Sequence, residues 1–235
     1  MIKKTSILTV IFVSFISVSS FAQNLGINFA LGFPQGEFKD NVSRTGLGIG
    51  GELLLPTVPG SPVNWGFNLI FMNYGDETRR APWSYTIPDL TVDVNRQNNF
   101  VAGHAMIRIA PPSPLFKPYL DLLAGGKYIW TQTSVKSRSS ASNLDVASDQ
   151  NFSDWAFSYG AGAGLMFSVY NEMGTNVMID IKARYLFGST AEYLGEGDVI
   201  VNTTNGTVKY NTRRSKTDML FAQIGVSLTF DAAIF

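Results

Sequence analysis

The stretch VMIDIKARYLF at residues 177–187 decides the fold class of this chain. Its odd-numbered positions are apolar or aromatic, whereas Asp180, Lys182 and Arg184 alternate with them. A period of two is typical of a β-strand, because successive side chains point to opposite faces of a sheet. One face of this segment is therefore apolar, and the other face carries ionisable groups.

Seven further segments show the same alternation, so the sequence predicts an all-β chain with eight strands. They lie near residues 25–33, 47–55, 65–72, 101–109, 120–130, 155–169 and 220–230. Proline supports this division, because it cannot donate to a sheet ladder and all 10 prolines fall at or between strand ends. No window after residue 22 offers the ~18 uncharged apolar residues of a transmembrane helix.

Alternation alone allows a water-soluble barrel with the apolar face inside or a membrane barrel with that face outside. Eight strands enclose a space that side chains only just fill, and the large apolar side chains of these strands exceed it. A charge that faces lipid at mid-depth costs about 2–4 kcal/mol, which places Asp180, Lys182 and Arg184 in the lumen. We therefore expect a closed transmembrane barrel whose apolar face contacts lipid.

The expected connections alternate strictly between short and long. The short ones are residues 57–64, 110–117 and 171–176, and the longer, more polar ones are residues 34–45, 75–98, 131–154 and 188–217. This alternation predicts an antiparallel up-and-down barrel with short periplasmic turns, long extracellular loops and both termini at the turn end. Aromatic residues near the strand ends, Tyr74 and Tyr119 among them, are expected in the interfacial girdles.

An export signal is expected at the N-terminus. Two lysines precede an apolar run at residues 7–18, and the small residues Ser20 and Ala22 form a cleavage site. The run is too short to span a bilayer as a helix. We therefore expect a signal peptide at residues 1–22 and an outer-membrane barrel at residues 23–235, located in the cell outer membrane.

Composition excludes several classes of function. Eighteen basic residues balance eighteen acidic ones, so no net positive field favours nucleic acid as a partner. The chain has no cysteine and one histidine, which excludes thiol catalysis and the common zinc sites. No cofactor or metal is expected. The one histidine, His104, falls inside the barrel near mid-membrane and is expected to be a satisfied lumen residue rather than a general base.

The side chains expected in the lumen include comparable numbers of acids and bases. Because unpaired buried charge is costly, they should pair and close the lumen. Arg108 and Asp121 flank the turn at residues 110–117 at similar heights and are the expected ion pair. The predicted polar network comprises Glu52, His104, Arg108, Asp121, Lys127, Asp180, Lys182, Arg184 and Gln223.

Three other segments carry further predictions. Gly160, Gly162 and Gly164 lie in a strand with no helix after them, so they should make room for bulky lumen neighbours instead of binding phosphate. Residues 198–212 hold an Asn-Gly hairpin signal, which predicts that the last two strands continue beyond the membrane as a ribbon, either passive or able to recruit a partner by strand addition. The serine-rich residues 134–149 are expected to form a mobile, solvated loop.

Together these features resemble the small eight-stranded outer-membrane barrels typified by the transmembrane domain of outer-membrane protein A and its stand-alone relatives. The resemblance covers nearly all of the mature chain and is architectural, with no chemical motif attached. In that family the terminal aromatic residue is part of the signal read by the barrel-assembly machinery. The resemblance implies this role for Phe230, with Phe235 as the alternative.

The sequence therefore favours a non-enzymatic outer-membrane barrel that acts in loop-mediated adhesion, envelope integrity or a larger outer-membrane complex, with charged residues closing its lumen. Its expected partners are outer-membrane lipid, the barrel-assembly machinery and a protein bound through the extracellular loops. One alternative is a narrow pore for ions or very small solutes. A lipid-modifying barrel enzyme is less favoured, because the rim offers no Ser, His and Asp candidates.

Overall fold

A computed structural model describes most of the chain. The described residues are 24–57, 61–84, 87–111, 113, 115–137, 145–172, 174–195, 198–201 and 208–230. The expected signal peptide at residues 1–22 and the alternative assembly residue Phe235 lie outside them. Among the described residues, no helix has the length and apolarity needed to cross a membrane.

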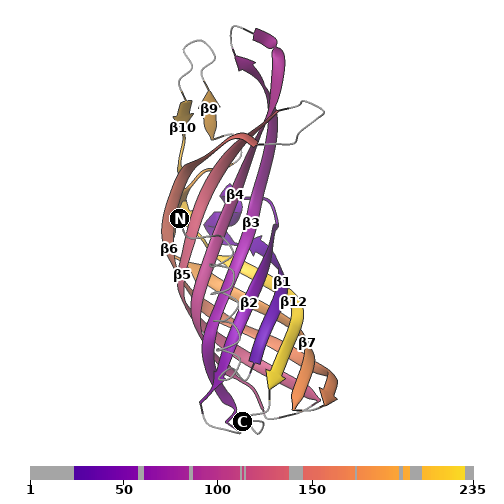
Figure 1. Cartoon of the computed structure of the whole chain (residues 1–235). Helices are drawn as coiled ribbons and strands as arrows, with labels where there is room; N and C mark the ends of the chain where they lie inside the picture. Colours follow the sequence, from indigo (N-terminus) through magenta and orange to yellow (C-terminus); the bar gives the residue numbers. More distant parts are fainter. Residues whose placement is uncertain are drawn as a thin grey trace, which may run out of the picture.

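Eight strands form a closed antiparallel barrel in the order β1-β12-β7-β6-β5-β4-β3-β2 (Figure 1). Each barrel strand pairs with the next one along the chain, and β1 closes the barrel by pairing with β12. Closure leaves the membrane-spanning part without an unpaired sheet edge, as a hydrocarbon environment requires. The barrel strands are β1 (Asn24–Pro34), β2 (Gly46–Pro56), β3 (Val63–Ser84), β4 (Ile87–Ile109), β5 (Phe116–Ser137), β6 (Asp145–Glu172), β7 (Thr175–Gly188) and β12 (Met219–Phe230).

The two faces of each strand separate as the alternation predicts. On β7, Ile179 and Ile181 are exposed on the outside of the barrel, whereas Asp180, Lys182 and Arg184 are buried inside it. A continuous apolar belt around a closed barrel is typical of a lipid-facing surface. Exposed apolar residues on the other barrel strands include Ile27, Ile49, Phe67, Ile107, Leu120, Phe157 and Ile224.

The two ends of the barrel differ. Asn24 at the start of β1 pairs with Thr229 near the end of β12. This end, which we call the turn end, also holds the connections at residues 57–62, 110–115 and 173–174. The opposite end is called the loop end. Phe230 is the last residue of β12, and its role in assembly stays a prediction.

The prediction of a long connection at residues 75–98 is wrong. β3 and β4 remain paired beyond the barrel as far as Ser84 and Ile87, so the connection shrinks to residues 85–86. These residues show no clean alternation of apolar and polar side chains, because a ribbon outside the bilayer needs no apolar row to face lipid. The same lack of alternation made the segment resemble a loop.

The prediction of a long connection at residues 131–154 is also largely wrong. β5 and β6 continue beyond the barrel and pair as far as Lys136 and Asp145. Residues 134–137 and 145–149 of the expected mobile loop are therefore strand, and its middle, residues 138–144, lies outside the described residues. β4 pairs with β5 over the same stretch. The extensions of β3, β4, β5 and β6 thus form one four-stranded sheet that projects past the loop end (Figure 1).

The ribbon expected between the last two barrel strands is present. β8 (Thr190–Tyr193) pairs with β11 (Arg213–Lys216), and β9 (Val199–Val201) pairs with β10 (Val208–Tyr210). The expected Asn-Gly turn at residues 205–206 lies outside the described residues. β8 and β9, which follow β7, thus pair with β11 and β10, which precede β12. The segment between the last two barrel strands therefore forms an antiparallel hairpin outside the barrel.

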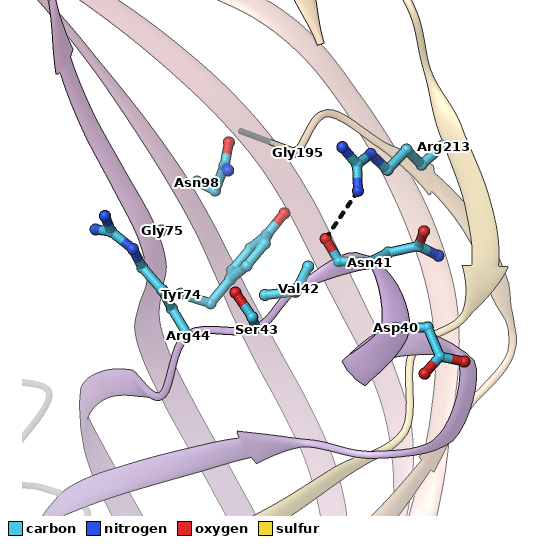
Figure 2. A pocket seen from close by; sticks show the side chains of 10 residues that line it. All are labelled: Asp40, Asn41, Val42, Ser43, Arg44, Tyr74, Gly75, Asn98, Gly195 and Arg213. Atoms are coloured by element: carbon cyan, nitrogen blue, oxygen red, sulfur yellow. Dashed lines mark hydrogen bonds between the residues drawn. The ribbon is translucent and has the colours of Figure 1, made fainter. Parts of the chain in front are cut away.

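A short helix, α2 (Gly36–Asn41), lies where the sequence indicated only a loop. Its one buried residue, Phe38, packs against Tyr74 and Tyr193, with ring centroids 5.6 and 5.1 Å apart. Figure 2 shows the end of α2 next to Tyr74 at the rim of the barrel. Six residues are too few to show a helical period, so no sequence pattern indicated this helix.

Candidate functional site

The lumen is the candidate site, because all nine polar residues expected there are buried. Their exposed fractions range from 0 to 4%. They come from five strands, β2, β4, β5, β7 and β12. Six of them form one ionic network, Gln223 is hydrogen-bonded to its member Arg184, and His104 and Lys127 have other partners.

The expected ion pair between Arg108 and Asp121 is confirmed. The guanidinium group of Arg108 donates from Nε to Asp121 Oδ1 at 2.7 Å and from Nη2 to Asp121 Oδ2 at 2.9 Å. The two residues lie directly opposite each other in the register of β4 and β5. A two-pronged contact of this kind is the strongest geometry for an arginine and a carboxylate.

Glu52 is the centre of the network, since three cations contact its carboxylate. Arg108 Nη2 donates to Oε2 at 2.9 Å, Arg184 Nη2 lies 2.8 Å from Oε1, and Lys182 Nζ also contacts Oε1. Glu52 belongs to β2, whereas Lys182 and Arg184 belong to β7, with β1 and β12 between them in the barrel. These ion pairs therefore cross the lumen instead of running along its wall.

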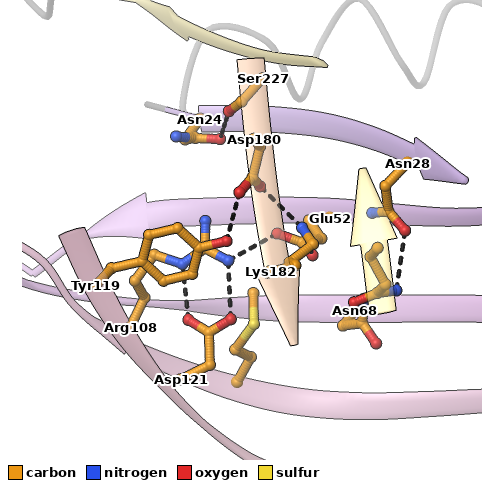
Figure 3. A network of polar contacts seen from close by, with 12 residues as sticks. Asn24, Asn28, Glu52, Asn68, Arg108, Tyr119, Asp121, Asp180, Lys182 and Ser227 are labelled. Atoms are coloured by element: carbon orange, nitrogen blue, oxygen red, sulfur yellow. Dashed lines mark hydrogen bonds and ion pairs between the residues drawn. The ribbon is translucent and has the colours of Figure 1, made fainter. Parts of the chain in front are cut away.

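Asp121 and Asp180 complete the set of acids. Arg184 donates to Asp121. Lys182 Nζ donates to Asp180 Oδ2 at 2.9 Å (Figure 3). Three acids and three bases thus form one network without net charge. Mutual pairing of this kind is what makes buried charge tolerable in a low-dielectric interior.

Tyr119 belongs to this network, although its place near a strand end predicted a girdle residue. Its hydroxyl donates to Asp180, and the guanidinium carbon of Arg108 lies 3.8 Å from the centre of its ring. The residue is 4% exposed. Strand alternation already indicated that Tyr119 points into the lumen, because its neighbour Leu120 points outward.

Glycine makes the room that the network needs, as the sequence predicted for β6. A Cβ atom on Gly164 would collide with the ring of Tyr119, and one on Gly162 would collide with the side chain of Arg184. Neighbouring strands lie only about 4.8 Å apart, so a large lumen side chain needs a small residue beside it. The glycines are therefore part of the site.

The remaining three predicted residues have other partners. His104 Nε2 lies 3.0 Å from Ser158 Oγ, and its Nδ1 has no protein partner. Gln223 links Arg184 to Asn28, since it accepts from Arg184 Nη1 at 3.3 Å and donates to Asn28 Oδ1 at 2.9 Å. No group of His, Asp and Glu side chains in the described part of the chain is arranged to hold a metal ion.

Lys127 lies apart from the ionic network. Its Nζ donates to the carbonyl oxygen of Thr217 at 2.8 Å and lies 5.0 Å from the centre of the Phe100 ring. It borders a layer of large apolar side chains that fill the lumen toward the loop end. Only small and charged residues were expected inside, so the sequence did not reveal this layer, whose members include Ile70, Met72, Phe100, Leu186, Met219 and Phe221.

An apolar outer belt around an enclosed ionic network is typical of a transmembrane β-barrel. The chain has the fold of a closed, eight-stranded antiparallel β-barrel. No protein-family model and no curated protein matches its sequence.

Solved structures that resemble this barrel come from several bacteria. Neisserial surface protein A has 14% sequence identity and a TM-score of 0.38, with 88% of this chain and 96% of that chain covered. The N-terminal β-barrel domain of Pseudomonas aeruginosa OprF has 12% identity and a TM-score of 0.37, with 89% and 99% covered. A major outer membrane protein from Thermus thermophilus has 11% identity and a TM-score of 0.41, with 88% and 99% covered.

Proposed function

We propose that this barrel is a non-enzymatic anchor whose lumen is closed and whose loop-end ribbons contact other molecules. The observation that supports the closed lumen is the ionic network around Glu52, in which three acids and three bases pair across the interior. The proposed roles are adhesion, envelope integrity or membership of a larger outer-membrane complex. Outer-membrane lipid and the barrel-assembly machinery are its proposed partners during insertion.

The size of the barrel supports a closed lumen. An eight-stranded barrel has an interior that side chains fill, so a solute path requires either small or absent side chains there. Here Arg108, Arg184 and Tyr119 are among the largest side chains of the interior, and each is at most 4% exposed. Moving any one of them means breaking buried ion pairs or hydrogen bonds at once, which is costly.

Planar-bilayer recording tests the closed lumen. The refolded full-length barrel should give no discrete channel events. Discrete channels whose conductance changes in Asp180→Asn or Lys182→Gln would contradict the proposal and support the narrow pore instead. Ile179→Val, which alters the lipid-facing surface next to Asp180, is the matched control and should leave the recording unchanged.

The lumen histidine supports a non-enzymatic role. His104 and Ser158 lie within hydrogen-bond distance, but both are at most 3% exposed, so a lipid substrate has no access to them. No carboxylate among the described residues orients His104 through Nδ1, as the base of a nucleophile-activating pair requires. Envelope lipid composition should be the same in His104→Ala cells and in wild-type cells, and a reproducible change in acyl chains would contradict this part of the proposal.

The projecting ribbons support a role in contacts. Among the described residues, the outer strands of the extended sheet of β3 to β6 pair with no further strand beyond Asn73 of β3 and before Ser158 of β6. A strand edge without a partner is able to bind another strand through backbone hydrogen bonds. Affinity purification from detergent-solubilised envelopes tests this role. A stoichiometric protein partner would be expected, and consistent recovery of the barrel alone would contradict the interaction role and leave only a structural one.

A further inference from the structure

A pocket of about 220 Å³ lies at the loop end of the barrel, outside the ionic network (Figure 2). Five separate segments line it, namely residues 40–44, 74–75, 98, 195 and 213. They belong to α2 and the segment after it, to the rim of β3 and β4, and to the ribbon near β11. Convergence of distant segments on one concave space is typical of a small-molecule site.

Tyr74 supplies an unpaired polar group to this pocket. Its ring is held between Phe38 and Phe100, at centroid distances of 5.6 and 6.0 Å, and the residue is 1% exposed. Its hydroxyl has no hydrogen-bond partner in the protein. Figure 2 shows this hydroxyl directed into the space between Asn98, Asn41 and Arg213.

A β-bulge in β3 directs the Tyr74 side chain toward the pocket. The pairing of β3 with β4 shifts register between Asn73 and Gly75, so Tyr74 lies in a bulge at the barrel rim. Bulges re-aim a side chain and are frequent next to binding sites. A buried hydroxyl without a partner loses its hydrogen bonds to water and gains none in return, so its presence in a native fold needs an explanation.

The lining of the pocket mixes hydrogen-bond donors and acceptors. Arg44 and Arg213 donate only, the carboxylate of Asp40 accepts only, and Ser43 and Asn98 do both. A ligand with several hydroxyl groups matches such a lining, because each hydroxyl also donates and accepts. A bare oxyanion matches it poorly, since it would leave the acceptors without a donor.

The charges around the pocket balance. Arg213 Nε lies 2.6 Å from Asp198 Oδ2, and this contact raises the pKa of Arg213 above its usual value. Asp198 does not line the pocket but neutralises Arg213. The other two charged lining residues, Arg44 and Asp40, carry one charge of each sign. The ligand that fits this balance is uncharged.

We propose that this pocket binds a single neutral sugar residue, with the Tyr74 hydroxyl bonded to one of its hydroxyl groups. A pocket of about 220 Å³ has room for one sugar ring. The apolar wall formed by Val42 and the Tyr74 ring faces the C–H groups of such a ring. The inference goes beyond the proposed function and holds whether or not the lumen conducts.

The test uses the full-length barrel in detergent micelles and ligand-observed NMR titrations with glucose, galactose and glucuronate. At least one neutral hexose should bind the wild-type barrel, and glucuronate should bind no more tightly. Tyr74→Phe removes only the unpaired hydroxyl, so it should weaken hexose binding about 3- to 10-fold, the effect of one lost hydrogen bond. The same variant should unfold at the same or a higher denaturant concentration than wild type.

Tyr193→Phe is the matched control. It also removes a hydroxyl from a buried tyrosine of the same cluster, but that hydroxyl is bonded to Ser215 at 2.6 Å and does not line the pocket. Hexose affinity should be unchanged in this variant, while stability falls. Equal hexose affinity in wild type and Tyr74→Phe would overturn the proposal.

A second variant keeps the proposal testable if Tyr74→Phe fails to fold. Ser43 is exposed and lines the pocket, so Ser43→Trp should fill the space without disturbing the barrel and should abolish hexose binding. Lys39→Trp, at an exposed position of α2 that does not line the pocket, should bind like wild type. Absence of binding by both neutral hexoses to the wild-type barrel, or tighter binding of glucuronate, would overturn the inference.

Discussion

Glu52 on β2 and Arg184 on β7 form an ion pair across the lumen, with Oε1 and Nη2 2.8 Å apart. Both side chains are almost fully buried, and Glu52 also meets Arg108 and Lys182. Ion pairs across the lumen therefore connect opposite sides of the barrel, in addition to the backbone hydrogen bonds between neighbouring strands. Substitutions in this interior and on the surfaces around it should have distinct, measurable effects.

Glu52→Gln should destabilise the barrel strongly. It removes the carboxylate that three cations share, and loss of one partner from a buried ion pair typically costs about 3–5 kcal/mol. Urea unfolding in lipid vesicles measures the free energy of unfolding. Glu172→Gln, at an exposed position near the turn end, is the control and should change it by less than about 1 kcal/mol. Equal stability of Glu52→Gln and wild type would show that the network contributes nothing.

Lys127→Met and Lys182→Met should act in opposite directions. Lys127 borders apolar side chains and donates to a carbonyl group, so an apolar side chain of similar length should be neutral or stabilise by about 1 kcal/mol. Lys182 bridges Glu52 and Asp180, and its replacement should destabilise. The two variants are compared in the same unfolding assay, and a larger loss at Lys127 would contradict the division of the lumen into ionic and apolar layers.

Gly164→Ala should reduce folding, because the added Cβ meets the ring of Tyr119. Overpacking in a tight interior costs about 1–3 kcal/mol. Gly103→Ala is the control, since its Cβ would find only Leu69 at 3.8 Å. The fraction of folded barrel is read from the gel mobility of unheated samples, and identical fractions for both variants would argue against a steric role of Gly164.

Single-cysteine labelling should confirm which face meets lipid. The chain has no cysteine of its own, so Ile181→Cys and Lys182→Cys each introduce one thiol. Ile181 is 48% exposed and Lys182 is 4% exposed. A membrane-soluble maleimide should therefore label the barrel at position 181 and leave position 182 unmodified. The reverse pattern would disprove the assignment of the apolar face to the bilayer.

Removal of residues 199–210 should leave the barrel intact. β9 and β10 pair only with each other in a two-stranded sheet, and the amide of Asn211 bonds to the carbonyl oxygen of Asp198 at 2.8 Å, so a short linker can replace the hairpin. Thermal unfolding should match that of the full-length barrel. A large loss of stability would show that the hairpin packs on the barrel, and loss of a purified partner would assign the contact role to this hairpin.

The features that the sequence predicted correctly depend on local periodicity. Alternation at residues 177–187 places Asp180, Lys182 and Arg184 inside the barrel, because side chains of a strand alternate between its two faces whatever the rest of the chain does. The ion pair of Arg108 and Asp121 could also be predicted from the sequence, because a short connection sets the register of β4 and β5.

Other features lie beyond any local signal. The extensions of β3 to β6 look like loops because a ribbon outside the bilayer needs no apolar row to face lipid, and their residues show no continuous one. The inward direction of Tyr74 follows from a bulge in β3, and Phe38 reaches it from a helix of only six residues. The sequence could not show that the apolar side chains near Phe100 fill the lumen instead of joining the outer aromatic girdles. That distinction requires the height of each residue along the barrel axis.

The local alternation of residue types was thus sufficient to determine the eight strand segments within the barrel wall, their outward face and the set of charges inside. Which charges meet was decided by closure of the barrel, because Glu52 and Arg184 are far apart in the sequence and come together only when β1 pairs with β12. Contacts across a lumen depend on strand tilt and stagger, which are properties of the whole closed sheet.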